Sequence, residues 1–126
     1  MKKVILSALL LITVSNTYAD YNKIMIAKNL CQLSEKIAAS AQKSRQDNIS
    51  PSQTTSNLFK FIDNKKHSNF EKESLSRIIF VSVTEAYKYP IYEDVSMQQK
   101  AISFFSEDAY TSCINALNAE LIKQKY

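Results

Sequence analysis

The 126-residue sequence predicts an all-α fold, a small bundle of about four helices in which one disulfide joins the first helix to the last. Apolar residues recur at spacings of three and four along most of the chain, as on one face of an amphipathic helix. Polar stretches with proline or asparagine separate these periodic segments. Cysteine occurs only twice, once in the first periodic segment and once in the last.

Residues 1–19 have the layout of a secretory signal peptide. Lys2 and Lys3 precede an uncharged apolar run at residues 4–14, and small and polar residues follow as far as Ala19. A transmembrane helix needs about 20 apolar residues, so this run is short for a membrane span, and an uncleaved anchor is the alternative. We expect cleavage after Ala19, which leaves residues 20–126 as a single helical domain in the periplasm or outside the cell.

Charge and glycine content argue against two classes of function. Removal of Lys2 and Lys3 with the leader lowers the net charge from +4 to +2, and the remaining basic residues are interleaved with acidic ones, unlike a nucleic-acid-binding surface. The chain has no glycine, which phosphate-binding loops need where the backbone approaches a nucleotide. We therefore expect no nucleic acid and no cofactor. Residues 20–126 also lack an apolar run of membrane length, so no stable membrane anchor is expected.

The two cysteines, Cys31 and Cys113, both lie in the part of the chain that would be exported. In an oxidising compartment two cysteines most simply form one disulfide. The alternatives are a pair of free buried thiols or a metal pair. A structural zinc site wants four ligands, and two sulfurs with the single histidine, His67, fall short of that number, so no metal is expected.

The first helix is expected over residues 20–46, with Cys31 at the edge of its apolar stripe. It should end at Asp47 and Asn48, because asparagine tolerates the left-handed conformation that closes many helices. The stripe comprises Ile26, Leu30, Leu33, Ile37 and Ala41.

Two capping boxes mark the starts of the next two helices. Ser50 and Gln53, with Pro51 at the first helical position, predict a short second helix over residues 51–63. Ser68 and Glu71 repeat the pattern and open a third segment that runs through residue 88.

The third segment contains a β-branched run at residues 78–84 that would also suit a buried strand. Read as a helix, the segment gathers its apolar residues on one side, and we expect a central helix, buried on most of its circumference. A strand is the alternative, although nothing else in the chain offers it a partner. The apolar side comprises Leu75, Ile79, Ser82, Val83 and Ala86.

A last helix is expected over residues 95–123. Cys113 lies within its apolar face, so a disulfide to Cys31 would join the first helix to the last. The stripe comprises Ala101, Ile102, Phe105, Ala109, Cys113, Ala116 and Leu117.

Three tyrosines, Tyr87, Tyr89 and Tyr92, surround Pro90. Proline disfavours helical geometry for the residue before it, so the third helix must end there. In a structural interpretation Tyr87 continues the apolar side of the helix and Tyr92 folds back over the corner. In a functional interpretation the exposed tyrosines form a protein-binding surface, because tyrosine is enriched at interfaces.

His67 is the only histidine, and its neighbours Lys65, Lys66 and Ser68 predict an exposed turn. A general base would need a positioned partner, for which Glu71 is the only local candidate. Glycosidases take their two carboxylates from converging elements, whereas the acidic pairs of this chain, Glu71/Glu73, Glu93/Asp94 and Glu107/Asp108, are one or two positions apart in sequence. We therefore expect no catalytic residue.

Several short motifs extend over most of residues 20–126. They are Cys31, Arg45-Gln46 before a turn, Glu85-Ala86-Tyr87 with Pro90, and Gln99, Ala101-Ile102, Phe105, Tyr110 and Cys113. In these motifs the chain resembles a group of small exported helical proteins of proteobacteria and their prophages, which are largely uncharacterised. The resemblance implies a helical, disulfide-closed, exported protein and carries over no catalytic residue. Asn48 stands where such proteins often have glycine, which suits a left-handed turn.

We expect an exported, non-enzymatic protein-binding module of inhibitor or immunity type, with a protein partner in the envelope or the exterior. Its expected architecture is similar to that of periplasmic immunity proteins that block cell-wall-degrading toxins, a likeness of fold and compartment that cannot establish function. The alternatives are a small envelope-acting hydrolase and a purely structural, phage-associated envelope factor.

Overall fold

The computed structural model describes residues 21–63 and 66–124, and over these residues the chain is helical and contains no strand. The helices are α1 (Tyr21–Gln46), α2 (Pro51–Asp63), α3 (Asn69–Ala86) and α4 (Val95–Gln124). The predicted all-α fold is confirmed, and the strand alternative for residues 78–84 is wrong because these residues lie inside α3. The expected leader, residues 1–19, lies outside the described residues.

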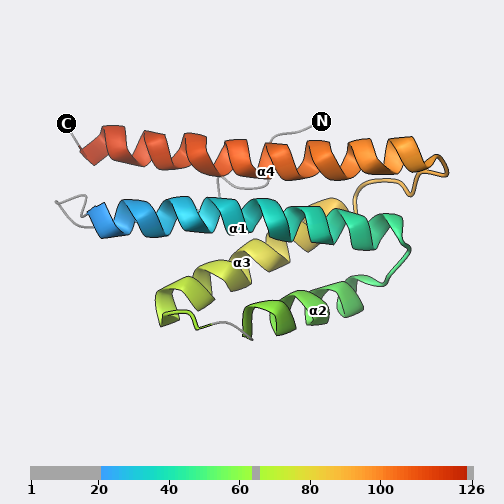
Figure 1. Cartoon of the computed structure of the whole chain (residues 1–126), viewed down its shortest axis with the longest axis horizontal. Helices are drawn as coiled ribbons and strands as arrows, with labels where there is room; N and C mark the ends of the chain where they lie inside the picture. The colour runs from blue at the N-terminus through green and yellow to red at the C-terminus, as the bar shows by residue number, and fades with distance from the viewer. Residues whose placement is uncertain (1–20, 64–65, 125–126) are drawn as a thin grey trace.

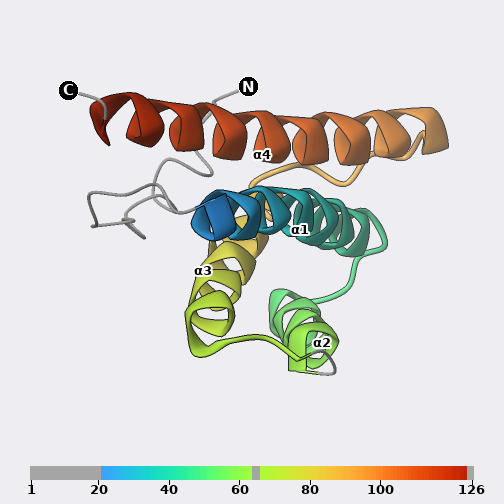
Figure 2. The ribbon, with the colours of Figure 1, turned by 60° about the vertical axis from the view of Figure 1, so that its left-hand side comes forward.

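The helices form three layers around α1 (Figures 1 and 2). Helix α4 runs antiparallel to α1 on one side of it, while α2 and α3 lie on the other side (Figure 2). Helix α1 contacts all three of the others, most extensively α4. We expected α3 to be the central helix, and this is wrong. Its outer side, with Arg77, Phe80 and Thr84, is exposed, whereas α1 is covered from two sides.

Helix α4 packs on α1 through a narrow seam. Its buried residues recur every four positions, which places them on one line along the helix. The disulfide between Cys31 and Cys113, with Cα atoms 5.4 Å apart, joins α1 to α4 within this seam, as the sequence predicts. It closes a loop with a sequence separation of 82, which in the chain-entropy model stabilises the fold by about 4 to 5 kcal/mol. The apolar residues of the seam are Ala101, Phe105, Ala109, Cys113 and Leu117.

Helix α1 ends as its sequence predicts. Asn48 has a φ of 60°, and it is the one described residue with a positive φ. The reversal lets Ile49 N donate to Ser44 O at 2.9 Å, which satisfies a carbonyl at the end of the helix. The chain then turns directly into α2.

The two predicted capping boxes have different outcomes. At α3 the box is complete, because Glu71 N donates to Ser68 Oγ at 3.2 Å and Ser68 N donates to Glu71 Oε1 at 3.4 Å. At α2 only half of it forms. Gln53 N donates to Ser50 Oγ at 3.2 Å, but the Gln53 side chain donates to Asn57 Oδ1 instead of returning to Ser50.

Candidate functional site

Residues 87–94, which join α3 to α4, and Val95 at the start of α4 form the α3–α4 corner, which contains all the predicted partner-binding residues. Helix α3 ends at Ala86, two residues earlier than expected, and Tyr87 N still donates to Val83 O at 3.1 Å. Tyr89 N donates to Ala86 O at 3.1 Å in a final turn. Pro90 prevents any further helical turn because it lacks a backbone N–H and restricts Tyr89.

Tyr87 points back into the fold. Its hydroxyl donates to Ile49 O at 2.5 Å, so the Thr54 hydroxyl, 2.7 Å away, must be the donor in the second bond. The Arg45 guanidinium lies 5.4 Å from the centroid of its ring, within the range of a cation–π contact. Tyr87 therefore ties the end of α3 to the α1–α2 connection.

Tyr89 packs on α4. Its ring meets Phe105 edge-on with the ring centroids 5.4 Å apart, and its carbonyl accepts from Arg45 Nε at 2.9 Å. Burial raises the pKa of its phenol above 10.0, and the nearby charge of Asp108 adds to the rise, so the phenol is neutral at physiological pH.

Gln46 and Gln98 hold the backbone on the far side of Pro90. Gln46 is buried, and its Nε2 donates to Pro90 O while its Oε1 accepts from Tyr92 N, both at 2.9 Å. Gln98 Nε2 donates to Tyr92 O at 2.6 Å. Side chains of α1 and α4 thus fix the corner from Tyr89 to Tyr92.

The outer surface of the α3–α4 corner combines exposed apolar residues with the exposed charged residues Lys88, Glu93 and Asp94. Tyr87, Tyr89 and Tyr92 are all half-buried, and Pro90 is exposed. Ile91 is 40% exposed and Val95 is 63% exposed. Sequence reasoning missed both of these aliphatic residues, because nothing in their spacing shows that the chain turns them outward. It also missed the clamping roles of Arg45 and Gln46, which lie more than forty positions from the backbone they hold.

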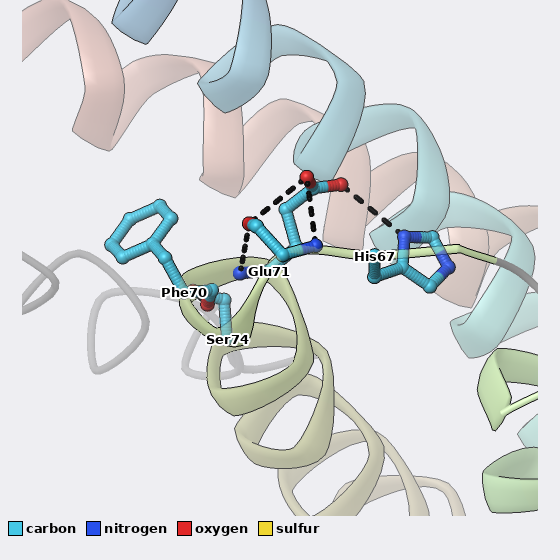
Figure 3. Close-up of polar contacts among 5 residues, drawn as sticks. His67, Phe70, Glu71 and Ser74 are labelled. Atoms are coloured by element: carbon cyan, nitrogen blue, oxygen red, sulfur yellow. Dashed lines mark hydrogen bonds and ion pairs between the residues drawn. The ribbon is translucent and has the colours of Figure 1, made fainter.

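His67 was expected to be an exposed turn residue, and this is wrong (Figure 3). Its side chain is only 9% exposed, and its Nδ1 lies 3.2 Å from Glu71 Oε2. A carboxylate only accepts, so Nδ1 carries the proton. The capping box turns the Glu71 side chain back toward the start of α3, which brings its second oxygen to the residue before the cap.

Glu71 is therefore the centre of a small polar cluster in which its two oxygens have separate partners (Figure 3). Oε1 accepts from Ser68 Oγ at 3.1 Å, and Oε2 accepts from His67. Burial raises the pKa of the Glu71 carboxyl, but the hydrogen bonds from His67 and Ser68 outweigh it and hold the pKa below 4.5. Ser68 donates to Glu71, so the arrangement lacks the serine–histidine bond of a nucleophilic triad.

The described residues contain neither a metal-binding cluster nor a membrane-spanning helix. Within residues 21–63 and 66–124 no group of three His, Cys, Asp or Glu side chains could hold a metal ion. None of the described helices is long and apolar enough to cross a membrane.

Comparison with known protein families, with curated protein sequences and with solved structures finds no match for this chain. The resemblance to small exported proteins of proteobacteria and prophages stays a prediction.

Proposed function

We propose that this protein is an exported, non-enzymatic binding module, of inhibitor or immunity type, that contacts a protein partner through the α3–α4 corner. The observation that carries this proposal is a backbone held by side-chain hydrogen bonds that presents exposed apolar residues next to exposed charged ones. Hydrogen bonds from Arg45, Gln46 and Gln98 hold the backbone, while Pro90 and Ile91 face outward.

A fixed surface favours binding because little conformational entropy is lost when the partner docks. The aliphatic side chains and half-buried tyrosines of the corner suit the centre of a protein interface, and the exposed charges of Lys88, Glu93 and Asp94 suit its polar rim. The hydroxyl of Tyr87 is held by Ile49 and Thr54 and takes no part in such a contact. The proposed contact surface therefore consists of Tyr89, Pro90, Ile91, Tyr92 and Val95.

Export is supported by two observations of different kinds. The Cys31–Cys113 disulfide suits an oxidising compartment, and the sequence of residues 1–19 has the pattern of a cleaved leader. The periplasm or the exterior is therefore where the partner would be met.

Site-specific photo-crosslinking tests the corner directly. A photoreactive phenylalanine derivative placed at Ile91 should yield an adduct with one envelope or exterior protein, and Ile91→Asp should abolish capture of that protein without lowering the melting temperature. Phe104, which is 50% exposed and nine positions further along the chain than Val95, is the matched control site on α4. No adduct at position 91, or the same adducts at both positions, would contradict the proposal. An adduct of twice the chain mass would identify a second copy of this chain as the partner.

A small envelope-acting hydrolase is the second candidate, because His67 has the carboxylate partner that a general base needs. Incubation of the oxidised protein with cell-wall material tests it. A release of soluble fragments that His67→Ala abolishes would establish the hydrolase. A structural envelope factor would show neither this activity nor the adduct at position 91.

A further inference from the structure

A groove with a volume of about 200 Å³ lies between α1 and α2. Its α1 wall consists of Lys36, Ser40 and Ser44, which follow one another at intervals of four and so share one side of the helix. Its α2 wall contains Asn57 and Phe61. The groove is a separate surface from the contact residues of the α3–α4 corner.

The groove exists because the residues facing it on α1 are small. Serine side chains at positions 40 and 44 do not span the gap to α2, and the contact of α1 with α2 is less extensive than its contacts with α3 and α4. Ile37 and Leu58 are buried and supply an apolar floor. The result is a polar rim over an apolar base, as in many small-ligand sites.

The rim favours an anion. Lys36 is exposed and forms no ion pair with a described residue, and no acidic side chain lines the groove. The hydroxyls of Ser40 and Ser44 form no hydrogen bond with a described residue and are able to donate. Asn57 Oδ1 already accepts from Gln53 Nε2 at 2.9 Å, so the amide of Asn57 has its NH₂ group left to donate.

We propose that this groove binds a small apolar carboxylate, with the carboxylate at Lys36 and the apolar part over Ile37 and Leu58 beside Phe61. Drug-sized sites have volumes of about 300 to 1,000 Å³, so a groove of about 200 Å³ takes a ligand the size of one amino-acid residue. The carboxylate could belong to a free short-chain acid or to the last residue of a peptide, because both present the same chemistry.

Amide chemical shifts of the oxidised protein, measured during titration with N-acetyl-leucine, test the site. Saturable shifts at Ser40, Ser44 and Asn57 are expected, with dissociation constants in the millimolar range for so small a ligand. N-acetyl-leucinamide, which lacks the carboxylate, and acetate, which lacks the apolar side chain, should both bind more weakly than N-acetyl-leucine. No saturable shift, shifts confined to other residues, or equal binding of the amide would overturn the proposal.

Two variants test separately how the charge of Lys36 and the shape of the groove contribute to binding. Lys36→Gln should weaken binding roughly three- to fivefold, the effect of an exposed ion pair, whereas Lys28→Gln on the same helix should leave it unchanged. Ser40→Leu should fill the groove and remove binding without lowering the melting temperature. Full binding by Ser40→Leu would overturn the proposal.

Two further probes identify the source of the carboxylate. Hexanoate represents a free short-chain acid, and a tetrapeptide ending in leucine represents a chain terminus. Tighter binding of hexanoate supports a free acid, and tighter binding of the tetrapeptide supports a peptide end. Binding of neither would overturn the proposal.

Discussion

The side-chain amide of Gln46 pairs with the backbone around Tyr92: its Oε1 accepts from Tyr92 N, and its Nε2 donates to Pro90 O, both at 2.9 Å. Gln46 Nε2 also donates to Gln42 Oε1 at 2.9 Å, which orients the amide. The last turn of α1 therefore decides where the α3–α4 corner sits. Local sequence alone would leave this connection free to adopt many conformations.

Gln46→Ala should lower the free energy of unfolding by about 2 to 4 kcal/mol, because it removes hydrogen bonds and leaves the Pro90 carbonyl and the Tyr92 amide without their partner. Urea denaturation measures the change. Gln53→Ala, which replaces an exposed glutamine, should cost no more than about 0.5 kcal/mol. Equal losses of unfolding free energy in the two variants would show that the hydrogen bonds of Gln46 to Pro90 and Tyr92 do not stabilise the fold.

Tyr87→Phe should cost about 1 to 2 kcal/mol, since it deprives both the Ile49 carbonyl and the Thr54 hydroxyl of a hydrogen bond. Tyr110→Phe is the matched control, because Tyr110 is also half-buried and its hydroxyl forms no hydrogen bond with a described residue. A neutral Tyr87→Phe in thermal unfolding would contradict the placement of this hydroxyl.

Glu71 should make stability depend on pH at acidic values. Its pKa in the folded protein lies below 4.5, so the charged form is favoured by folding. This contribution is complete above the pKa of the unfolded chain and is lost as the pH falls through the folded-state pKa. The stability difference between wild type and Glu71→Gln should therefore shrink as the pH is lowered below about 4.5.

The control for Glu71 is Glu73→Gln on the same helix. Glu73 is exposed and pairs with Arg77 on the surface, where ion pairs contribute little. A difference between wild type and Glu71→Gln that stays constant from neutral to strongly acidic pH would refute the prediction. Denaturant titrations across that pH range provide the measurement.

Ser82→Ala should leave stability unchanged or raise it by up to about 1 kcal/mol, because the Ser82 hydroxyl is buried with no described hydrogen-bond partner. Ser74→Ala should be less favourable, since Ser74 Oγ donates to Phe70 O at 2.8 Å on the same helix. Calorimetric melting of the two variants compares them. A clear loss in Ser82→Ala would show that its hydroxyl has a partner in solution.

Much of the helical framework was predictable because its signals are local. Asn48 closes α1, Ser68 and Glu71 open α3, and Pro90 follows its end, each through contacts within a few residues of its own position. The pairing of Cys31 with Cys113 was predictable from their number, on the expectation that the chain is exported. These features follow from backbone geometry and composition, which a sequence displays directly.

The candidate site was less predictable because it depends on which helix faces meet. The sequence identified the tyrosines around Pro90, but not Arg45 and Gln46, which hold them from the end of α1. The burial of His67 depends on where Glu71 turns its second oxygen.

By itself, then, the sequence determined the number of helices and most of their ends, because these depend on short-range preferences, and the disulfide between α1 and α4, because the chain has only two cysteines. Only the tertiary structure decided that α1 lies at the centre, that the corner is clamped with Ile91 and Val95 outward, and that serines leave a groove beside α2. The reason is physical: burial and hydrogen bonding between distant segments depend on how the helices pack, and many packings satisfy the same periodic pattern.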